Sequence, residues 1–308
     1  MNIQQLEYII ALDKHRHFAK AAEDCNVTQP TLSTMVKKFE LELGVDLFQR
    51  NRSAVIPTEI GVLIIDQAKR VISESRKIQA IVVEEENSMS GRIRMALLPT
   101  IAPYLMPVIS DMLTKALPKV EFDFSELLTS QCLQALSDNS IDIAIIASKS
   151  EMDDLKEIPL YYEQFLGYVS KNEALFEQTS IRTNEVDGER LWLLDEGHCF
   201  RDQLVKFCNL KSFVNKHNTY RHGSMATFMS MVETGQGVTF IPELAYPRLS
   251  DAQKELVRPF AIPRPSREIN LCYRGDFVRQ HILNAIAETI KKAVPEEMLQ
   301  LRKGDQLV

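Results

Sequence analysis

The stretch FAKAAEDCNVTQPTLSTMVKKFELELGVDLFQR, residues 18–50, decides the fold of the N-terminal region. Residues 18–25 predict a short helix whose alanines lack bulk, so that another helix can cross close to its backbone. Asn26 suits the left-handed position that ends such a helix. Thr28 is a good N-cap for the next helix, and Pro30 is tolerated in its first turn because the amides there have no intrahelical partner. The stretch therefore predicts two crossed helices joined by a short turn.

The helix after Thr28 has two faces. Leu32, Val36, Phe39 and Leu43 recur at helical spacing and form the face that turns inward. The outward face has hydroxyls near its start and lysines further along, which suits a helix in the major groove of DNA, where hydroxyls reach base edges and lysines pair with phosphates. Basic residues just beyond this helix look like a wing that adds backbone or minor-groove contacts. The candidate DNA-binding residues are Gln29, Pro30, Thr31, Ser33, Thr34, Lys37, Lys38, Arg50 and Arg52.

The whole chain limits the possible classes of protein. Its 308 residues are too many for one ordinary domain, and its net charge of −6 argues against a general nucleic-acid coat, so DNA binding must come from a local surface. By periodicity alone, a helical module with a merely solvated polar face fits equally well. We find neither a signal peptide nor an apolar run long enough for a membrane span, and five cysteines without zinc-type spacing do not make a disulfide framework. We expect a cytoplasmic protein whose cysteines are reduced thiols in the resting state.

A long helix is predicted after Thr58, which can cap it. Ile60, Ile64, Ala68, Val71, Ile78 and Val82 continue one apolar stripe towards residue 86. Such a helix of roughly 40 Å needs a partner for its stripe. The partner is either the helix's own domain or the same helix of a second subunit, and we favour the second subunit.

Short apolar runs alternate with helical segments after residue 91. Strands are predicted at 93–98, 120–127, 141–147, 165–170, 191–194, 238–241 and 269–274, with helices at 103–116 and 130–138 and after Phe277. This alternation predicts a parallel sheet wrapped by helices. Because such sheets bind ligands beyond the carboxyl ends of their strands, we expect Thr100, Thr129 and residues 196–199 to converge in one crevice.

The run at 18–50 closely resembles the helix-turn-helix of LysR-type transcription regulators, with its small alanines, its TQPTLS turn and its ELGVDLF segment. Ala54 is a departure from the family pattern, because a wing could carry another cation at this position. The resemblance implies an α/β protein with an N-terminal all-α winged helix-turn-helix domain and a two-lobed regulatory domain like that of periplasmic binding proteins. The implied ranges are 1–58 for DNA binding, 59–88 for a dimerising linker helix and 89–308 for regulation, with lobe I at 89–163 and 269–308 and lobe II at 164–268.

The segment DEGHCFRDQLVKFC, residues 195–208, carries the most chemistry. Cys199 is predicted at the start of a helix beside His198 and near Arg201, and a helix N-terminus and cations both favour a thiolate. Hydroxyls of Thr100 and Thr129 could bind the oxygens of a peroxide attacked by that thiolate. We expect Asp202 to orient Arg201 or a water rather than to react itself.

The same segment resembles the signature of the OxyR peroxide sensors within the LysR family, together with PT at 99–100, LTSQ at 128–131 and Arg267. The resemblance implies that Cys199 is oxidised by hydrogen peroxide and that Cys208 resolves its sulfenic acid as a disulfide. In one continuous helix the two cysteines would lie roughly 13 Å apart along the axis, whereas a disulfide needs α-carbons within roughly 7 Å, so residues 198–211 would have to be remodelled.

The implied partners are promoter DNA of antioxidant genes, RNA polymerase, a thiol reductant for reset and further copies of the chain in a homodimer or homotetramer. Neither a cofactor nor a membrane is implied. Cys25 and Cys272 are interpreted as small buried residues, Cys132 as a helix-packing residue that could lie near the pocket, and His217 and His222 fit no metal-ligand pattern. Two other functions remain open: a LysR regulator that binds a small organic effector between its lobes, and a thiol peroxidase, against which the DNA-binding module argues.

Overall fold

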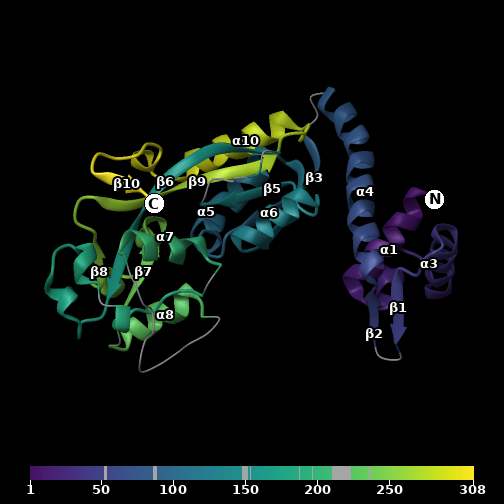
Figure 1. The fold of residues 1–308 in the computed structure, drawn as a ribbon. Coiled ribbons are helices and arrows are strands. Elements are labelled where there is room, and N and C mark those ends of the chain that lie inside the picture. Colours follow the sequence, from purple (N-terminus) through teal and green to yellow (C-terminus); the bar gives the residue numbers. More distant parts are fainter. Residues whose placement is uncertain are drawn as a thin grey trace. The chain divides into compact units, whose positions relative to one another are not determined.

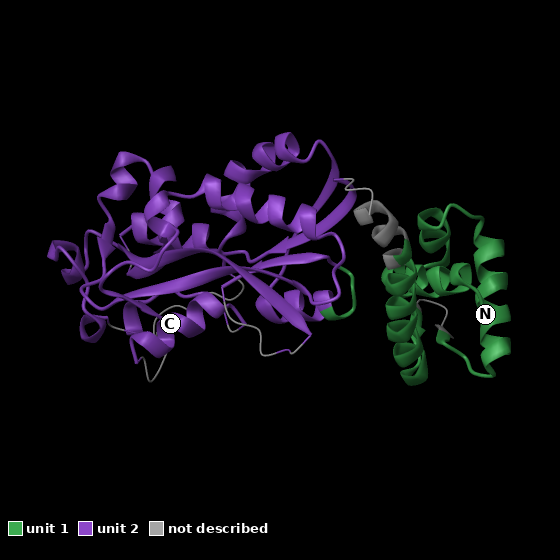
Figure 2. Cartoon of the chain, turned by 90° about the horizontal axis from the view of Figure 1, so that it is seen from above, with its two compact units in different colours: residues 1–88, 137–140 green, residues 89–136, 141–308 purple. Residues whose placement is uncertain are grey.

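This computed structural model describes residues 1–51, 54–85, 89–147, 152, 154–186, 188–195, 197–209, 223–235 and 237–308. Two compact units divide the chain (Figure 2). The first comprises residues 1–88 with 137–140, and the second comprises residues 89–136 with 141–308. Among the helices in these ranges, none combines the length and the apolar character that a membrane span requires.

The first unit is built from three short helices whose ends are set by local signals: α1 (Ile3–His15), α2 (Phe18–Asp24) and α3 (Gln29–Leu43). Asn26 adopts the positive φ of 55° that was expected after α2. Thr28 accepts a hydrogen bond from the Thr31 amide, and Gly44 ends α3 with a φ of 73°. Leu32, Val36 and Phe39 are buried as predicted, but Leu43 is 38% exposed because α3 ends there, beyond the helices that cover its earlier turns.

A two-stranded wing follows α3. Strand β1 (Phe48–Asn51) pairs antiparallel with β2 (Ala54–Pro57), and the expected contact residue Arg52 lies outside the described residues. The buried Glu40 carboxylate of α3 accepts hydrogen bonds from the amides of Leu47 and Phe48, at 2.9 and 3.2 Å. This carboxylate therefore fixes where the wing begins.

The long helix α4 (Glu59–Glu85) begins at Thr58, whose hydroxyl accepts a hydrogen bond from the Gly61 amide. Its first half packs on its own domain through Ile65, Ala68 and Ile72, which join the core of the first unit. The predicted stripe is therefore wrong in part. Two members of the predicted stripe, Ile60 and Ile78, remain exposed on α4 together with Val62 and Leu63.

The second unit is organised around an eight-stranded sheet in which β4, β3, β5, β9, β6 and β7 are neighbours in that order. Strands β3 (Ser90–Leu97), β4 (Lys119–Glu126) and β5 (Ile143–Ile146) are parallel. Strands β6 (Leu155–Val169), β7 (Val238–Pro242) and β9 (Arg264–Arg274) join by antiparallel pairing, so the prediction of a parallel sheet is wrong for this half. Residues 191–194 do not form a strand and contribute only an isolated bridge from Leu191 to Val238.

Two separate apolar cores define two lobes of this unit, and the long strand β6 contributes to both (Figure 1). The first lobe packs α5 (Ala102–Ala116), α6 (Thr129–Ser137) and α10 (Gln280–Ala293) on β3 and β5. The second lobe packs α7 (Cys199–Phe207) and α8 (Met225–Glu233) around β7. The remaining short elements are α9 (Asp251–Lys254), β8 (Val257–Pro259), β10 (Asp305–Leu307) and 3₁₀ turns at Ala174–Glu177, Thr183–Glu185, Gly188–Arg190, Glu243–Arg248 and Glu296–Met298.

Candidate redox site

A small pocket forms in the second unit where the end of β3, the start of α6 and the start of α7 meet. Its empty space, part of which is open to solvent, is about 150 Å³, and it is too narrow for a water-sized sphere. Thr100, Thr129 and Cys199, which the sequence placed beyond strand ends, come together here, while Glu196 lies outside the described residues. The residues that line the pocket are Leu98, Pro99, Thr100, Leu128, Thr129, Gly197, His198 and Cys199.

Cys199 is the first residue of α7, and the backbone before it is arranged to put it there. Gly197 has a φ of +94°, which a residue with a side chain rarely adopts, and a Cβ at this position would contact the Leu128 side chain at 3.6 Å. His198 follows as the N-cap residue, with extended backbone and no side-chain cap. The half-buried Cys199 thiol therefore lies at the partially positive end of the helix.

The charges around the thiol differ from the expectation in one respect. Burial lowers the pKa of His198 below its usual value, although Asp195 and Asp202 act in the opposite direction, so this imidazole is mainly neutral near pH 7. Arg201 pairs with Asp202 through an Nη1–Oδ1 distance of 3.2 Å, and neither side chain lines the pocket. Arg201 therefore pairs with Asp202 outside the pocket, and His198 is a pocket wall.

Arg267 lies behind the pocket and is fully buried. Its Nη1 donates to the Thr100 hydroxyl at 3.0 Å and its Nη2 to the Thr100 carbonyl at 3.1 Å. Its charge is balanced by the equally buried Glu163 of β6, with an Nη2–Oε1 distance of 2.6 Å. Burial raises the pKa of Glu163, and the adjacent guanidinium opposes that rise. Because Arg267 occupies an acceptor site of the Thr100 oxygen, the Thr100 proton remains available to donate into the pocket.

Phe200 connects this buried pair to α7. Its ring lies 4.6 Å from the ring of Phe165, and the guanidinium carbon of Arg267 lies 4.9 Å from its centroid. The residue next to Cys199 is therefore anchored on β6 and β9. Sequence reasoning missed both Glu163 and Phe200. A charged residue at position 163, just before an apolar run, was the available signal, because a buried charge requires a partner.

The Thr129 hydroxyl is the least satisfied polar group at the site. Its oxygen is buried and has no hydrogen-bond partner among the described residues. A buried hydroxyl in this condition costs about 1–3 kcal/mol, and a small polar ligand or a water in the pocket would relieve that cost.

Cys208 lies at the opposite end of α7 from Cys199. It is the C-cap residue, is 7% exposed and belongs to the core of the second lobe, where burial raises its pKa to about 12. At about 1.5 Å per residue, nine residues of helix separate the two cysteines by about 13 Å along the axis. Both thiols are free.

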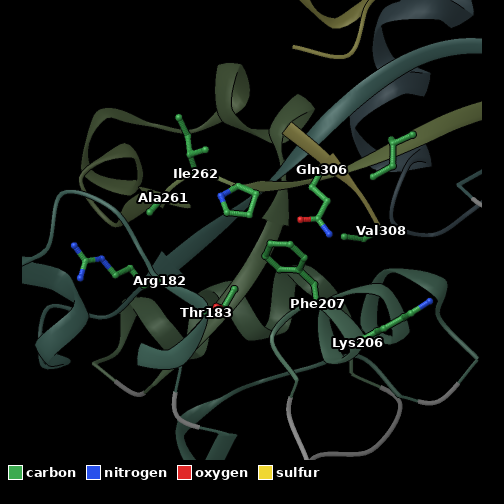
Figure 3. A pocket seen from close by; sticks show the side chains of 10 residues that line it. Arg182, Thr183, Lys206, Phe207, Ala261, Ile262, Gln306 and Val308 are labelled. Atoms are coloured by element: carbon green, nitrogen blue, oxygen red, sulfur yellow. The ribbon is translucent and has the colours of Figure 1, made fainter. Parts of the chain in front are cut away.

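The middle of α7 is also held in place. The Gln203 amide donates to the carbonyl oxygens of Ala147, at 2.8 Å, and Val308, at 3.1 Å. The last turn, by contrast, borders a solvent-open hollow of about 1250 Å³, which Lys206 and Phe207 line together with Ile262 and Gln306 (Figure 3). The helix is thus firmly packed at its start and middle and borders open space at its end.

The other cysteines lie in packed surroundings. Cys132 of α6 and Cys272 of β9 are fully buried in the first lobe, and Cys25 is half-buried after α2. Within the described ranges, no group of three His, Cys, Asp or Glu side chains is placed to hold a metal ion. His217 and His222 lie outside those ranges.

The candidate DNA-binding face lies on α3. Ser33 is half-buried, and the other candidates on the helix and its cap, Gln29, Pro30, Thr31, Thr34, Lys37 and Lys38, are exposed. Arg50 lies on β1 of the wing. The first turn of α3 therefore presents hydroxyl and amide groups, and its later turns present ammonium groups, on the side opposite its buried residues.

Comparison with known proteins matches both units. Residues 3–62 match the model of the bacterial regulatory helix-turn-helix protein of the lysR family, and residues 86–295 match the LysR substrate binding domain. A "Hydrogen peroxide-inducible genes activator" of Pectobacterium carotovorum subsp. carotovorum is 35% identical over 98% of this chain and 100% of its own length.

Solved structures agree with these matches. A full-length OxyR variant from Pseudomonas aeruginosa is 32% identical, with a TM-score of 0.81 over 98% of this chain and 99% of that one. OxyR from Porphyromonas gingivalis is 52% identical, with a TM-score of 0.68 over 71% of this chain and 99% of that one. The chain belongs to the LysR family of bacterial DNA-binding transcription regulators and, within it, to the OxyR group.

Proposed function

We propose that this protein is a transcription regulator that senses hydrogen peroxide by oxidation of Cys199. The observation that carries the proposal is the pocket, which Cys199 at a helix N-terminus lines together with Thr129, whose hydroxyl is buried without a partner among the described residues, and Thr100, whose hydroxyl is held by Arg267. Its relatives from Pectobacterium carotovorum and Haemophilus influenzae, both named hydrogen peroxide-inducible genes activators, point to the same activity.

In the first step the Cys199 thiolate attacks one oxygen of hydrogen peroxide and the O–O bond breaks. The sulfur gains an S–OH group, and the other oxygen leaves as hydroxide and takes a proton to become water. Thr100 and Thr129 supply hydrogen bonds that position the peroxide and stabilise the charge on the leaving oxygen.

In the second step the Cys208 thiol condenses with the sulfenic acid, forming an S–S bond and releasing water. Because the two residues are about 13 Å apart along α7, this step requires that helix to unwind. Unwinding also removes Cys208 from the core that raises its pKa, so the same movement brings the thiol closer and increases its thiolate fraction. A thiol reductant would reverse the bond.

The output of the switch is DNA binding through α3. Two subunits joined along the exposed apolar side chains of α4 would present two recognition helices to a pseudo-palindromic promoter. We extend the proposal to a cytoplasmic homodimer or homotetramer that acts with RNA polymerase at antioxidant genes. It is a regulator that reacts once and is then reset, rather than an enzyme that turns over.

The size of the pocket favours peroxide over an organic effector at this position. Pockets for drug-sized ligands measure roughly 300–1,000 Å³, whereas the pocket at Cys199 is too tight for a water-sized sphere, so that a small side-chain movement would admit peroxide but not an organic effector. Peroxide has two oxygens, and the two threonines offer two hydroxyls.

The test is peptide mass mapping of the reduced full chain after a stoichiometric pulse of hydrogen peroxide, with free thiols alkylated. A Cys199–Cys208 crosslink within seconds, absent from Cys199→Ser, would support the proposal. Hydrogen exchange should then rise across residues 198–208 on oxidation. If Cys199 stays alkylatable after the pulse, the sensor function is wrong and the regulator has another effector.

A further inference from the structure

A second cysteine lies on the peroxide pocket's own wall. Cys132 follows the pocket residue Thr129 by one turn of α6, which places the two on the same side of that helix. The Cys132 amide donates at 2.8 Å to the carbonyl of Leu128, another pocket residue. The start of α6 is thus one continuous wall made of Leu128, Thr129 and the turn that contains Cys132.

The Cys199 side chain packs against the apolar core to which Cys132 belongs. The electrostatics of Cys132 agree with this packing. Burial raises the pKa of Cys132 to about 12, and the Cys199 thiol contributes to the same rise. The pKa of Cys208 is raised by burial alone, with no contribution from Cys199. Cys199 thus meets the wall that carries Cys132 at the pocket, whereas Cys208 lies at the far end of α7 and belongs to the other core.

We propose that Cys132 is a second resolving cysteine, which condenses with the Cys199 sulfenic acid while α7 remains helical. The inference rests on the proposed peroxide oxidation of Cys199. The reaction is Cys199–SOH plus Cys132–SH, giving an S–S bond and one water, and hydrogen peroxide is the oxidant that was consumed in forming the sulfenic acid. The bond would join α6 of the first lobe to α7 of the second.

Two routes then compete for one sulfenic acid. The route through Cys208 requires α7 to unwind. The route through Cys132 requires α6 and α7 to shift where they meet at the pocket, so that the Cys132 thiol leaves the Leu127 carbonyl and can ionise while α7 stays helical. A bond to Cys132 would leave α7 folded, so its product would retain the reduced form of the second lobe. Cys132 would limit how much oxidised Cys199 reaches the remodelled state and would protect the sulfenic acid from further oxidation.

The experiment uses the full chain in four forms: Cys208→Ser, Cys132→Ala/Cys208→Ser, Cys272→Ala/Cys208→Ser and the parent. Each receives a stoichiometric pulse of hydrogen peroxide, and samples taken over time are treated with dimedone to label sulfenic acid and then mapped without reduction. Cys272 is the matched control because it is fully buried in the same core, yet Cys199 does not contribute to the rise in its pKa.

We expect a Cys199–Cys132 crosslink in Cys208→Ser and in the Cys272→Ala double variant, with a dimedone signal at Cys199 that decays at least tenfold faster than in Cys132→Ala/Cys208→Ser. Hydrogen exchange of residues 200–207 should stay at the reduced level in the crosslinked Cys208→Ser form. Equal decay in all three variants with no crosslink would overturn the inference while leaving Cys199 as the sensor. The absence of any dimedone adduct at Cys199 would overturn the proposed function as well.

Discussion

Replacing Glu163 by Gln should destabilise the regulatory unit strongly, because it leaves the Arg267 guanidinium buried without a counter-charge. Both side chains are at most 1% exposed, so solvent and salt screen their interaction very little. Removing one partner of such a pair costs about 3–5 kcal/mol. If the free energy of unfolding falls by about 3 kcal/mol per molar urea, the unfolding midpoint should fall by roughly 1 to 2 M. The single tryptophan, Trp192, is buried in the second lobe and reports the transition by fluorescence.

The matched control is the double variant Glu163→Leu/Arg267→Met, which removes both charges and keeps apolar volume. It should recover most of the lost stability, since replacing a whole buried pair is often neutral. Despite the recovered stability, Cys199 of the double variant should react with peroxide more slowly than in the parent, because the Arg267 hydrogen bond that orients Thr100 is gone. If the urea midpoint of Glu163→Gln lies within about 0.3 M of the parent, a shift far smaller than a broken buried pair would cause, this account of the pair is refuted.

Three further predictions concern other parts of the chain. Glu40→Ala should raise hydrogen exchange at the start of the wing and cost about 2–3 kcal/mol, because two amides lose a charged acceptor, and Glu40→Gln should cost about half as much; equal exchange in the two variants would contradict it. Lys37→Ala should weaken binding to every DNA sequence and lower the salt slope of log K by about 1, whereas Ser33→Ala should alter sequence preference in the same fluorescence-anisotropy assay. Burial lowers the pKa of His198, so on acidification the unfolded chain binds this proton before the folded chain does, and the stability present above pH 6.5 should be lost as the pH falls towards the folded-state pKa. In urea titrations, His198→Gln should therefore lose less stability between pH 7 and pH 5 than the parent. An NMR titration should place the pKa of His198 below its usual value.

Local signals in the sequence were sufficient for the helices of the first unit. Thr28, Thr58 and Asn26 act where their side chains or backbone preferences predicted, because caps depend only on neighbouring residues. The directions of strand pairing were not predictable in this way. Strands β6 and β9 pair across about a hundred residues of sequence, and periodicity contains no information on whether such distant strands run parallel or antiparallel.

The candidate site shows the same division. The motif at 195–208 identified Cys199, and the strand-end rule correctly joined it to Thr100 and Thr129. Glu163 was missed because its role depends on a buried partner 104 positions away. Treating His198 as a cation overlooked its burial, which only the folded chain reveals.

The packing of α7 also has an electrochemical consequence. Under the proposed Cys199–Cys208 switch, oxidation must withdraw α7 side chains such as Phe200 and Leu204 from the core, where both are at most 2% exposed. Burying two such side chains is worth about 3–6 kcal/mol, and 1.4 kcal/mol corresponds to about 30 mV for a two-electron couple. Helix packing would therefore raise the midpoint potential by about 60–130 mV. The threshold at which the regulator becomes oxidised could then be adjusted by changing apolar side chains of α7 that never touch peroxide.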